Sequence, residues 1–242
     1  MRIITLAKRN LLEIIRDPIT FVFSIILPVF LLFIFQQFDI PSDIYNINNF
    51  APSTVVFGFA FISLFTASLI SKDRSTSLLS RLYASPLKSH EYILGYTLAL
   101  LPVAIFQSIL FFIVAVILGL TFSINTIITI LVLIPLSILF ISLGLLIGCL
   151  VNDKAAPGVG SVVVQLVAFT SGMYFDINML GGTIKVISNI LPFRYVVDIS
   201  RAALSGNLLE MKPEILIIII YIIVISILSA IVFKKSMIKD NK

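Results

Sequence analysis

Five long stretches of the chain contain no aspartate, glutamate, lysine, arginine or histidine. They are residues 18–38, 44–71, 92–152, 155–175 and 215–233. A membrane-spanning helix needs roughly 20 apolar residues, so four of these stretches have room for one crossing each. The stretch 92–152 has 61 residues, enough for two crossings and the turn between them. We therefore expect an all-α integral membrane protein with six transmembrane helices.

The composition supports a membrane protein over the whole length of the chain. Hydrophobic residues make up 59% of the chain and charged residues 12%, against about 25% charged residues in an ordinary soluble domain. A soluble fold of this length could not bury so much apolar surface, so lipid must be its solvent. The charged segments are too short for a separate soluble domain. We expect a single transmembrane domain over residues 1–242.

The uncharged stretches also give the expected order of elements. Residues 1–16 are amphipathic, with Arg9, Glu13 and Arg16 on the polar side, which predicts a helix in the membrane interface. The alternative is a basic tail that binds no surface. Asp17 and the proline after it end this helix, because proline disfavours helix in the residue before it. The predicted spans follow at residues 19–38, 53–71, 92–120, 126–151, 157–175 and 215–233.

Two charged segments connect these spans. Residues 73–91 lie between the second and third spans on the side of the termini. Residues 176–212, between the fifth and sixth spans, are too long for a turn and too short for two crossings. We interpret them as an outer helical hairpin that dips partway into the membrane, a re-entrant segment. Tyr195, Asp198 and Arg201 have the spacing i, i+3 and i+6 there, so Asp198 and Arg201 could form an ion pair.

The positive charges predict the orientation of the chain. With both termini in the cytoplasm, 13 lysines and arginines lie on the cytoplasmic side and 4 on the opposite side. This excess follows the positive-inside rule and predicts a multi-pass protein of the cell membrane. The formal net charge of +5 then has anionic membrane lipid as its partner, and we expect no nucleic acid partner.

The residues needed for several kinds of membrane chemistry are missing from the sequence. The predicted spans contain no ionisable residue, whereas proton-driven carriers commonly depend on a buried acid or histidine. The only histidine is His90, which excludes a zinc or serine-type intramembrane protease. No sequence of the form G-x-x-x-x-G-K-[ST] is present to bind ATP. We expect no catalytic residue, metal site or bound cofactor, so uphill transport would need energy from another polypeptide.

The charged segment 73–91 contains a candidate contact for such a polypeptide. Residues 75–83 would form a short amphipathic helix that ends before Pro86. One side of this helix would carry Leu78, Leu79 and Leu82, and the other side would carry Arg74 and Arg81. A helix of this kind can bind a groove on a cytosolic protein, whereas the alternative is a plain interfacial loop.

Three segments stand out beside the order of elements: Arg16-Asp17-Pro18, Arg81-Leu82-Tyr83-Ala84-Ser85-Pro86-Leu87 and Leu191-Pro192-Phe193-Arg194-Tyr195-Val196-Val197-Asp198-Ile199-Ser200-Arg201. In these segments and in its order of elements, the chain resembles the membrane subunit of type-2 ABC exporters. The chain departs from the family pattern at Ser75-Thr76-Ser77, where an acidic residue and a glycine are usual.

The resemblance implies a permease that works as a dimer, with a second copy or a paralogue completing the pathway. ATP and Mg would bind to a separate cytosolic ATP-binding subunit, and the helix around residues 74–86 would be the coupling helix that contacts it. The implied cargo is a lipophilic or amphipathic drug or antimicrobial peptide, as in multidrug efflux and antibiotic resistance. Two alternatives from other classes are a channel or lipid scramblase that needs no ATPase, and a membrane sensor subunit.

Four residues inside the predicted spans suggest helix contacts. Gln107 and Gln165 are polar and lie away from the span ends, so they could line a substrate path or hydrogen-bond between helices. Gly144 and Gly148 have the spacing that permits close approach of helices. We expect this glycine pair to pack within one subunit rather than between two subunits.

Overall fold

The computed structural model describes residues 2–38, 42–76, 89–177, 179 and 182–240. Every regular element among these residues is helical, which confirms the all-α prediction. Four helices in the described part are long and apolar enough to cross a membrane. They are α4 (Ile47–Ser75), α6 (Ser89–Ile117), α7 (Ile124–Leu150) and α11 (Lys212–Asp240). The other two predicted spans coincide with shorter apolar helices, Val22–Gln37 and Ala156–Thr170, so the count of six crossings stays a prediction.

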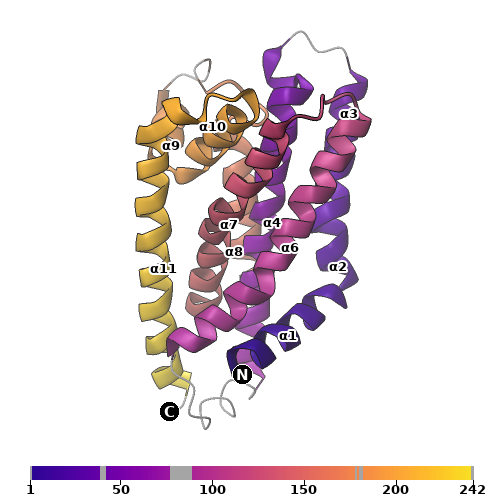
Figure 1. Cartoon of the computed structure of the whole chain (residues 1–242). Helices are drawn as coiled ribbons and strands as arrows, with labels where there is room; N and C mark the ends of the chain where they lie inside the picture. The colour runs from indigo at the N-terminus through magenta and orange to yellow at the C-terminus, as the bar shows by residue number, and fades with distance from the viewer. Residues whose placement is uncertain (1, 39–41, 77–88, 178, 180–181, 241–242) are drawn as a thin grey trace.

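The long helices lie side by side in one bundle, with both termini at the same end (Figure 1). We call this the terminal end. Helix α1 (Arg2–Ile15) lies obliquely across the terminal end and packs along α6. Its amphipathic sequence gives it an apolar side that buries Leu6 and Ile14.

The first predicted span, residues 19–38, is not one regular helix. It consists of α2 (Pro18–Phe21), one π-helical turn (Val22–Ile26) and α3 (Leu27–Gln37). Pro28 has no N–H for the carbonyl four residues earlier, and its ring would clash with that carbonyl in a regular α-helix. The wider π turn directly before α3 accommodates the proline, a common cause of irregularity inside apolar helices.

Helix α4 occupies the centre of the bundle. It packs against α7, α6, α10 (Pro192–Ser205) and α8 (Ala156–Thr170), and most of its apolar stretch is buried. It begins six residues before the predicted start of the second span and continues beyond residue 71. Asn46 caps its start, because the Asn46 side chain accepts a hydrogen bond from the backbone N–H of Asn48 at 3.1 Å.

Other helix ends also differ from the predicted spans. The predicted third span, 92–120, is α6 from Ser89 to Ile117, and α8 ends at Thr170 instead of residue 175. The last helix extends at both ends beyond the predicted 215–233. Apolar runs mark the part of a helix that lipid can surround, and polar turns can continue the helix beyond that part.

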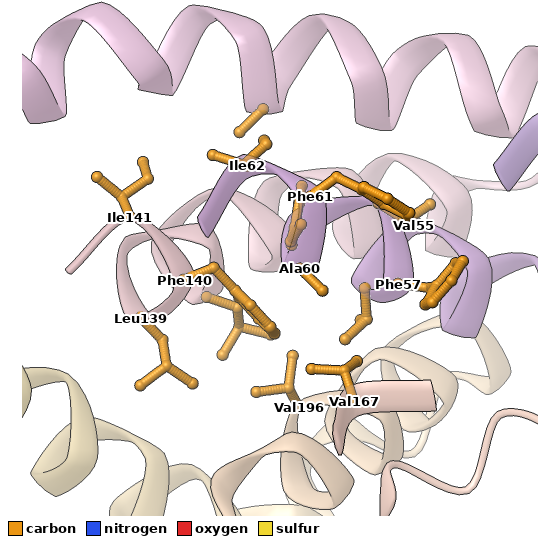
Figure 2. Close-up of a cluster of buried hydrophobic side chains, with 14 of the residues drawn as sticks. Val55, Phe57, Ala60, Phe61, Ile62, Leu139, Phe140, Ile141, Val167 and Val196 are labelled. Carbon is orange, nitrogen blue, oxygen red and sulfur yellow. The ribbon is translucent and has the colours of Figure 1, made fainter. Parts of the chain in front are cut away.

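Phenylalanines and branched aliphatic residues of α4 and α7 form the core of the bundle (Figure 2). Phe59 of α4 lies 5.9 Å, ring centre to ring centre, from Phe140 of α7. Phe140 is in turn 5.9 Å from Phe193 of α10. All three rings are buried, so the bundle and the outer helix α10 share one continuous core.

Gly144 and Gly148 of α7 lie directly against the backbone of α4. A β-carbon at Gly144 would be 2.3 Å from the carbonyl oxygen of Ser63, and one at Gly148 would be 2.6 Å from that of Ala67. No side chain fits at these distances. The prediction that this pair packs within one subunit is confirmed.

The described part of the predicted outer segment, residues 176–212, contains two α-helices and the short 3-10 helix Leu208–Met211. Helix α9 (Gly182–Ile190) and helix α10 lie together at the end of the bundle opposite the termini (Figure 1). Pro192 occupies the first turn of α10, where its missing N–H costs nothing. Gly206 ends that helix with a φ of +84°, a conformation that glycine adopts freely. The depth of these helices in a membrane stays a prediction.

Candidate functional site

An ion cluster at the terminal end connects three helices. The guanidinium of Arg9 on α1 donates two hydrogen bonds to the carboxylate of Asp73 on α4, at 2.6 and 2.8 Å. The hydroxyl of Tyr96 on α6 donates a third to the same carboxylate, at 2.6 Å. We call the group of Arg9, Glu13, Lys72, Asp73 and Tyr96 the α1–α4–α6 junction.

Asp73 is the buried centre of this junction, with 1% of its side chain exposed. A buried carboxylate is tolerated only when charged partners and hydrogen bonds replace its lost hydration. Arg9 and Tyr96 supply both. Burial alone would lower the pKa of the Arg9 guanidinium, but the hydrogen bond and the negative charge of Asp73 outweigh burial and raise it.

A second pair of charges extends the junction toward solvent. Glu13, one turn after Arg9 on α1, binds the Arg9 guanidinium at 2.6 Å. The same carboxylate accepts a hydrogen bond from Lys72 of α4 at 3.0 Å. Lys72 is 63% exposed, so this outer pair adds little stability by itself. Its geometric effect is that α1 is bound to α4 at two successive positions.

Arg74, one of the predicted coupling residues, lies in the last turn of α4 and contacts the end of α7. Its part in coupling stays a prediction. Its guanidinium donates to the carbonyl oxygens of Gly148, Cys149 and Val151 at 2.8, 2.7 and 3.2 Å. The last carbonyls of a helix have no partner within the helix, and a cation there also complements the helix dipole. The other predicted coupling residues lie outside the described residues: Leu78, Leu79, Arg81, Leu82 and Pro86.

Arg16 and Asp17 were predicted at the polar end of the interfacial helix. Arg16 is exposed and takes no part in the junction. The Asp17 side chain accepts a hydrogen bond from the backbone N–H of Ile19 at 3.1 Å and caps α2. Asp17 therefore fixes the turn between α1 and the first apolar segment.

Comparison with family models identifies the chain. The model of the ABC-2 type transporter family matches residues 1–205, which include the junction and the outer helices. The chain belongs to this family. It is thus a membrane subunit of an ABC transporter, a class in which a separate ATP-binding subunit supplies the energy. A comparison with curated proteins found no match.

The two glutamines predicted to line a substrate path lie in different environments in this ABC-2 transporter subunit. Gln107 on α6 is 0% exposed, and neither its amide nitrogen nor its amide oxygen has a hydrogen-bond partner among the described residues. It packs on Gly58, where a β-carbon would lie 1.7 Å from the amide nitrogen. Gln165 on α8 is exposed. The subunit therefore does not bring the two together, and the described residues offer Gln107 no interhelical hydrogen bond.

In this transporter subunit, the ion pair of Asp198 is not the one that the sequence suggests. Asp198 pairs with Arg194, one turn earlier on α10, at 3.3 Å, and not with Arg201. The hydroxyl of Tyr195 donates to the carbonyl oxygen of Asn189 at the end of α9, at 2.6 Å. Burial raises the pKa of the Asp198 carboxyl above its usual value, although the nearby positive charges oppose that shift.

Arg201 connects α10 to the ends of two other helices. Its Nε donates to the carbonyl oxygen of Asn49 and to the hydroxyl of Ser53 on α4, both at 3.0 Å. Its Nη2 donates to the carbonyl oxygen of Gly172, after α8, at 2.9 Å. The guanidinium is mostly buried, and this burial lowers its pKa.

Asp73 and Tyr96 are the functional candidates that the sequence reasoning missed. Asp73 was assigned to the charged segment after the second span, although it follows Thr66 by seven residues and Ile70 by three. Residues with this spacing share one side of a helix, and both of those residues are buried. The helical pattern therefore contained a signal for the burial of Asp73.

Proposed function

We propose that this protein is the permease subunit of an ATP-driven ABC exporter, in which a separate cytosolic subunit hydrolyses ATP. The terminal end of the bundle faces the cytoplasm in this proposal. Membership in the ABC-2 family supports the transport role. The observation that carries the proposal is the buried carboxylate of Asp73, which binds α1 through Arg9 and α6 through Tyr96.

The junction gives a physical route for a movement at the cytoplasmic surface to reach the centre of the bundle. Helices α4 and α6 flank residues 77–88, the segment in which the sequence predicts a coupling helix. A movement of this segment or of α1 acts on Asp73, because α1 binds the Asp73 carboxylate through Arg9 and α6 binds it through Tyr96. Since α4 packs against most of the bundle, its displacement changes the packing of α6, α7 and α8 together.

A second copy of the chain, or a paralogue, completes the pathway in this proposal. Helix α8 packs on α4 with one side and exposes the other, which combines polar and apolar residues: Ser161, Val162, Gln165, Leu166 and Phe169. The exposed side of α11 is aliphatic and suits lipid contact. The mixed side of α8 suits a pathway for a lipophilic or amphipathic cargo, such as a drug or an antimicrobial peptide.

Copurification tests the partnership. The tagged protein, solubilised from its native membrane, should retain a stoichiometric subunit with a phosphate-binding loop, to which ATP and Mg bind. Reconstitution of the two should give ATP-dependent export. Recovery of this chain alone, in a detergent that preserves other ABC complexes, would contradict the proposal.

A substitution in the coupling segment tests the mechanism. Replacing Leu78 and Leu82 together by aspartate removes the apolar side that the sequence predicts for the coupling helix. ATP hydrolysis by the partner should continue while export stops. Replacement of Lys8, an exposed cation on α1, by glutamine controls for a change of net charge at the terminal end. Full export by the double variant would exclude this segment as the coupling contact.

A further inference from the structure

A cavity of about 700 Å³ lies between α1, the start of α2 and α4, next to the α1–α4–α6 junction. Its charged lining includes Arg16, Glu13 and Lys72, and its apolar lining includes Phe65 and Leu69 of α4. The cavity is therefore amphipathic. Its volume is within the range of sites that hold a small molecule or part of a lipid.

The charged lining has three positive side chains, Arg9, Arg16 and Lys72, against the two carboxylates of Glu13 and Asp17. The Glu13 carboxylate already binds Arg9 and Lys72, and Asp17 caps α2. The side chain of Arg16 is exposed and has no hydrogen-bond or ion-pair partner among the residues that the structure describes. Lys72 uses one of its three N–H groups on Glu13. The free capacity thus suits an anionic group with several acceptor oxygens, such as a phosphate.

The position of the cavity suits a lipid as the source of that phosphate. It lies where the amphipathic helix α1 ends and the first apolar segment begins. If α1 lies in the membrane interface, as its sequence predicts, this is the level at which the headgroups meet the acyl chains. The exposed apolar residues Ile15 and Ile19 flank the Arg16–Pro18 lining, so acyl chains can reach the cavity without crossing a polar surface.

We propose that this cavity binds one membrane phospholipid. Arg16 and Lys72 bind the phosphate of the lipid, and Phe65 and Leu69 contact the acyl chains. This site is separate from the cargo pathway proposed on α8. A bound lipid would lie between α1 and α4, the two helices that the Arg9–Asp73 and Glu13–Lys72 pairs connect. Occupancy would therefore stabilise the junction.

The test is thermal unfolding of the purified protein in a phosphate-free maltoside detergent. Short-chain phosphatidylglycerol should raise the Tm in a saturable manner. Arg16→Gln should increase the lipid concentration for half of this shift about ten-fold, since a charge-assisted bond is lost. Arg16→Gln should leave the Tm without lipid unchanged, because the Arg16 side chain is exposed and no described residue pairs with it. Lys8→Gln, which also removes one positive charge but at a residue outside the cavity lining, should not alter the lipid response.

Two further ligands distinguish the source of the phosphate. Glycerol phosphate has the anionic group without acyl chains, and a short-chain diacylglycerol has the chains without the phosphate. Each should give no more than a small part of the shift. An equal shift with glycerol phosphate would assign the site to a soluble phosphate, and an equal shift with diacylglycerol would exclude phosphate recognition. Either result, or an unchanged lipid response in Arg16→Gln, overturns the proposal.

Discussion

The guanidinium of Arg9 and the carboxylate of Asp73, 64 residues apart in the chain, form a two-bond ion pair at 2.6 and 2.8 Å. An amphipathic helix at a membrane surface could in principle move independently of the bundle. In this protein the pair binds α1 to the central helix through a carboxylate that is almost fully buried. Displacement of α1 therefore requires either movement of α4 or exposure of the Asp73 charge.

The first prediction concerns the coupling between these two side chains. In a double-mutant cycle of Arg9→Gln and Asp73→Asn, each single variant should lose stability, and the coupling energy should be about 1–3 kcal/mol. Arg9 is partly exposed, which keeps the value below that of a fully buried pair. Chemical unfolding in detergent micelles gives the free energies for the cycle.

The same two variants should also separate ATP hydrolysis from export. If the junction transmits movement, the partner subunit should still hydrolyse ATP while cargo export falls. Lys8→Gln, on the same helix but away from the junction, controls for the loss of a positive charge. Additive stability losses in the cycle, with normal export, would remove the junction from the mechanism.

The second prediction isolates the hydroxyl of Tyr96. Tyr96→Phe removes the hydroxyl that donates to Asp73 and keeps a buried ring of nearly the same volume. The loss of a hydrogen bond to a charged acceptor should reduce the free energy of unfolding by about 1.5–3 kcal/mol. In an Asp73→Asn background the same change should cost clearly less. Equal costs in the two backgrounds would mean that the hydroxyl acts through another neighbour.

Hydropathy predicted the helical class and the apolar stretches, because the bilayer restricts both composition and backbone structure. It could not predict where helices end. Helix α4 includes Asp73 and continues to Ser75, since the partners of Asp73 allow a charged residue to stay helical and buried. Those partners lie 64 and 23 residues away in the sequence, and no local pattern contains them.

The contacts of single charged residues could not be predicted from the sequence for a related reason. The spacing of Asp198 and Arg201 suggested an ion pair within one helix, but Arg201 binds backbone carbonyls brought close by tertiary packing. Arg74 likewise binds carbonyls at the end of α7. Side-chain patterns along a sequence do not reveal backbone acceptors at the ends of other helices.

The third prediction compares the same substitution at two glycines. Gly144→Ala places a methyl group 2.3 Å from the backbone oxygen of Ser63, so α4 and α7 must separate, at a cost of about 1–3 kcal/mol. Gly158→Ala on α8 meets no atom within 4 Å and should stabilise the helix by up to about 1 kcal/mol. Thermal unfolding of both variants measures the difference. A stabilising Gly144→Ala would show that the two helices can move apart at little cost.

The fourth prediction uses the raised pKa of Asp198. The folded protein holds the proton of this carboxyl more tightly than the unfolded chain, so the carboxyl favours folding at low pH. That contribution is lost as the pH rises from the usual value of 3.8 through the raised pKa. The Asp198→Asn variant has no group that titrates at this position. The Tm of the wild type minus that of Asp198→Asn should therefore fall as the pH rises from about 4 through the raised pKa.

Measurement of both proteins in one buffer series cancels the titration of all other groups. A difference in Tm that does not change with pH would mean that Asp198 has the same pKa in the folded and unfolded protein. A difference that grows with pH would mean that Arg194, its ion-pair partner, outweighs burial.

The fifth prediction concerns Arg201, whose guanidinium binds the start of α4 and the residue Gly172 after α8 at the same time. Arg201→Lys keeps the positive charge, but the donors of an ammonium group share one nitrogen and cannot reach both sites. At least one buried carbonyl should lose its partner, and stability should fall by about 1–3 kcal/mol.

Hydrogen exchange should become faster in the first turns of α4 while the terminal end keeps its protection. Arg16→Lys, the same exchange at an exposed arginine, is the control. Unchanged exchange near Asn49 would mean that packing of α10 alone holds these helix ends together.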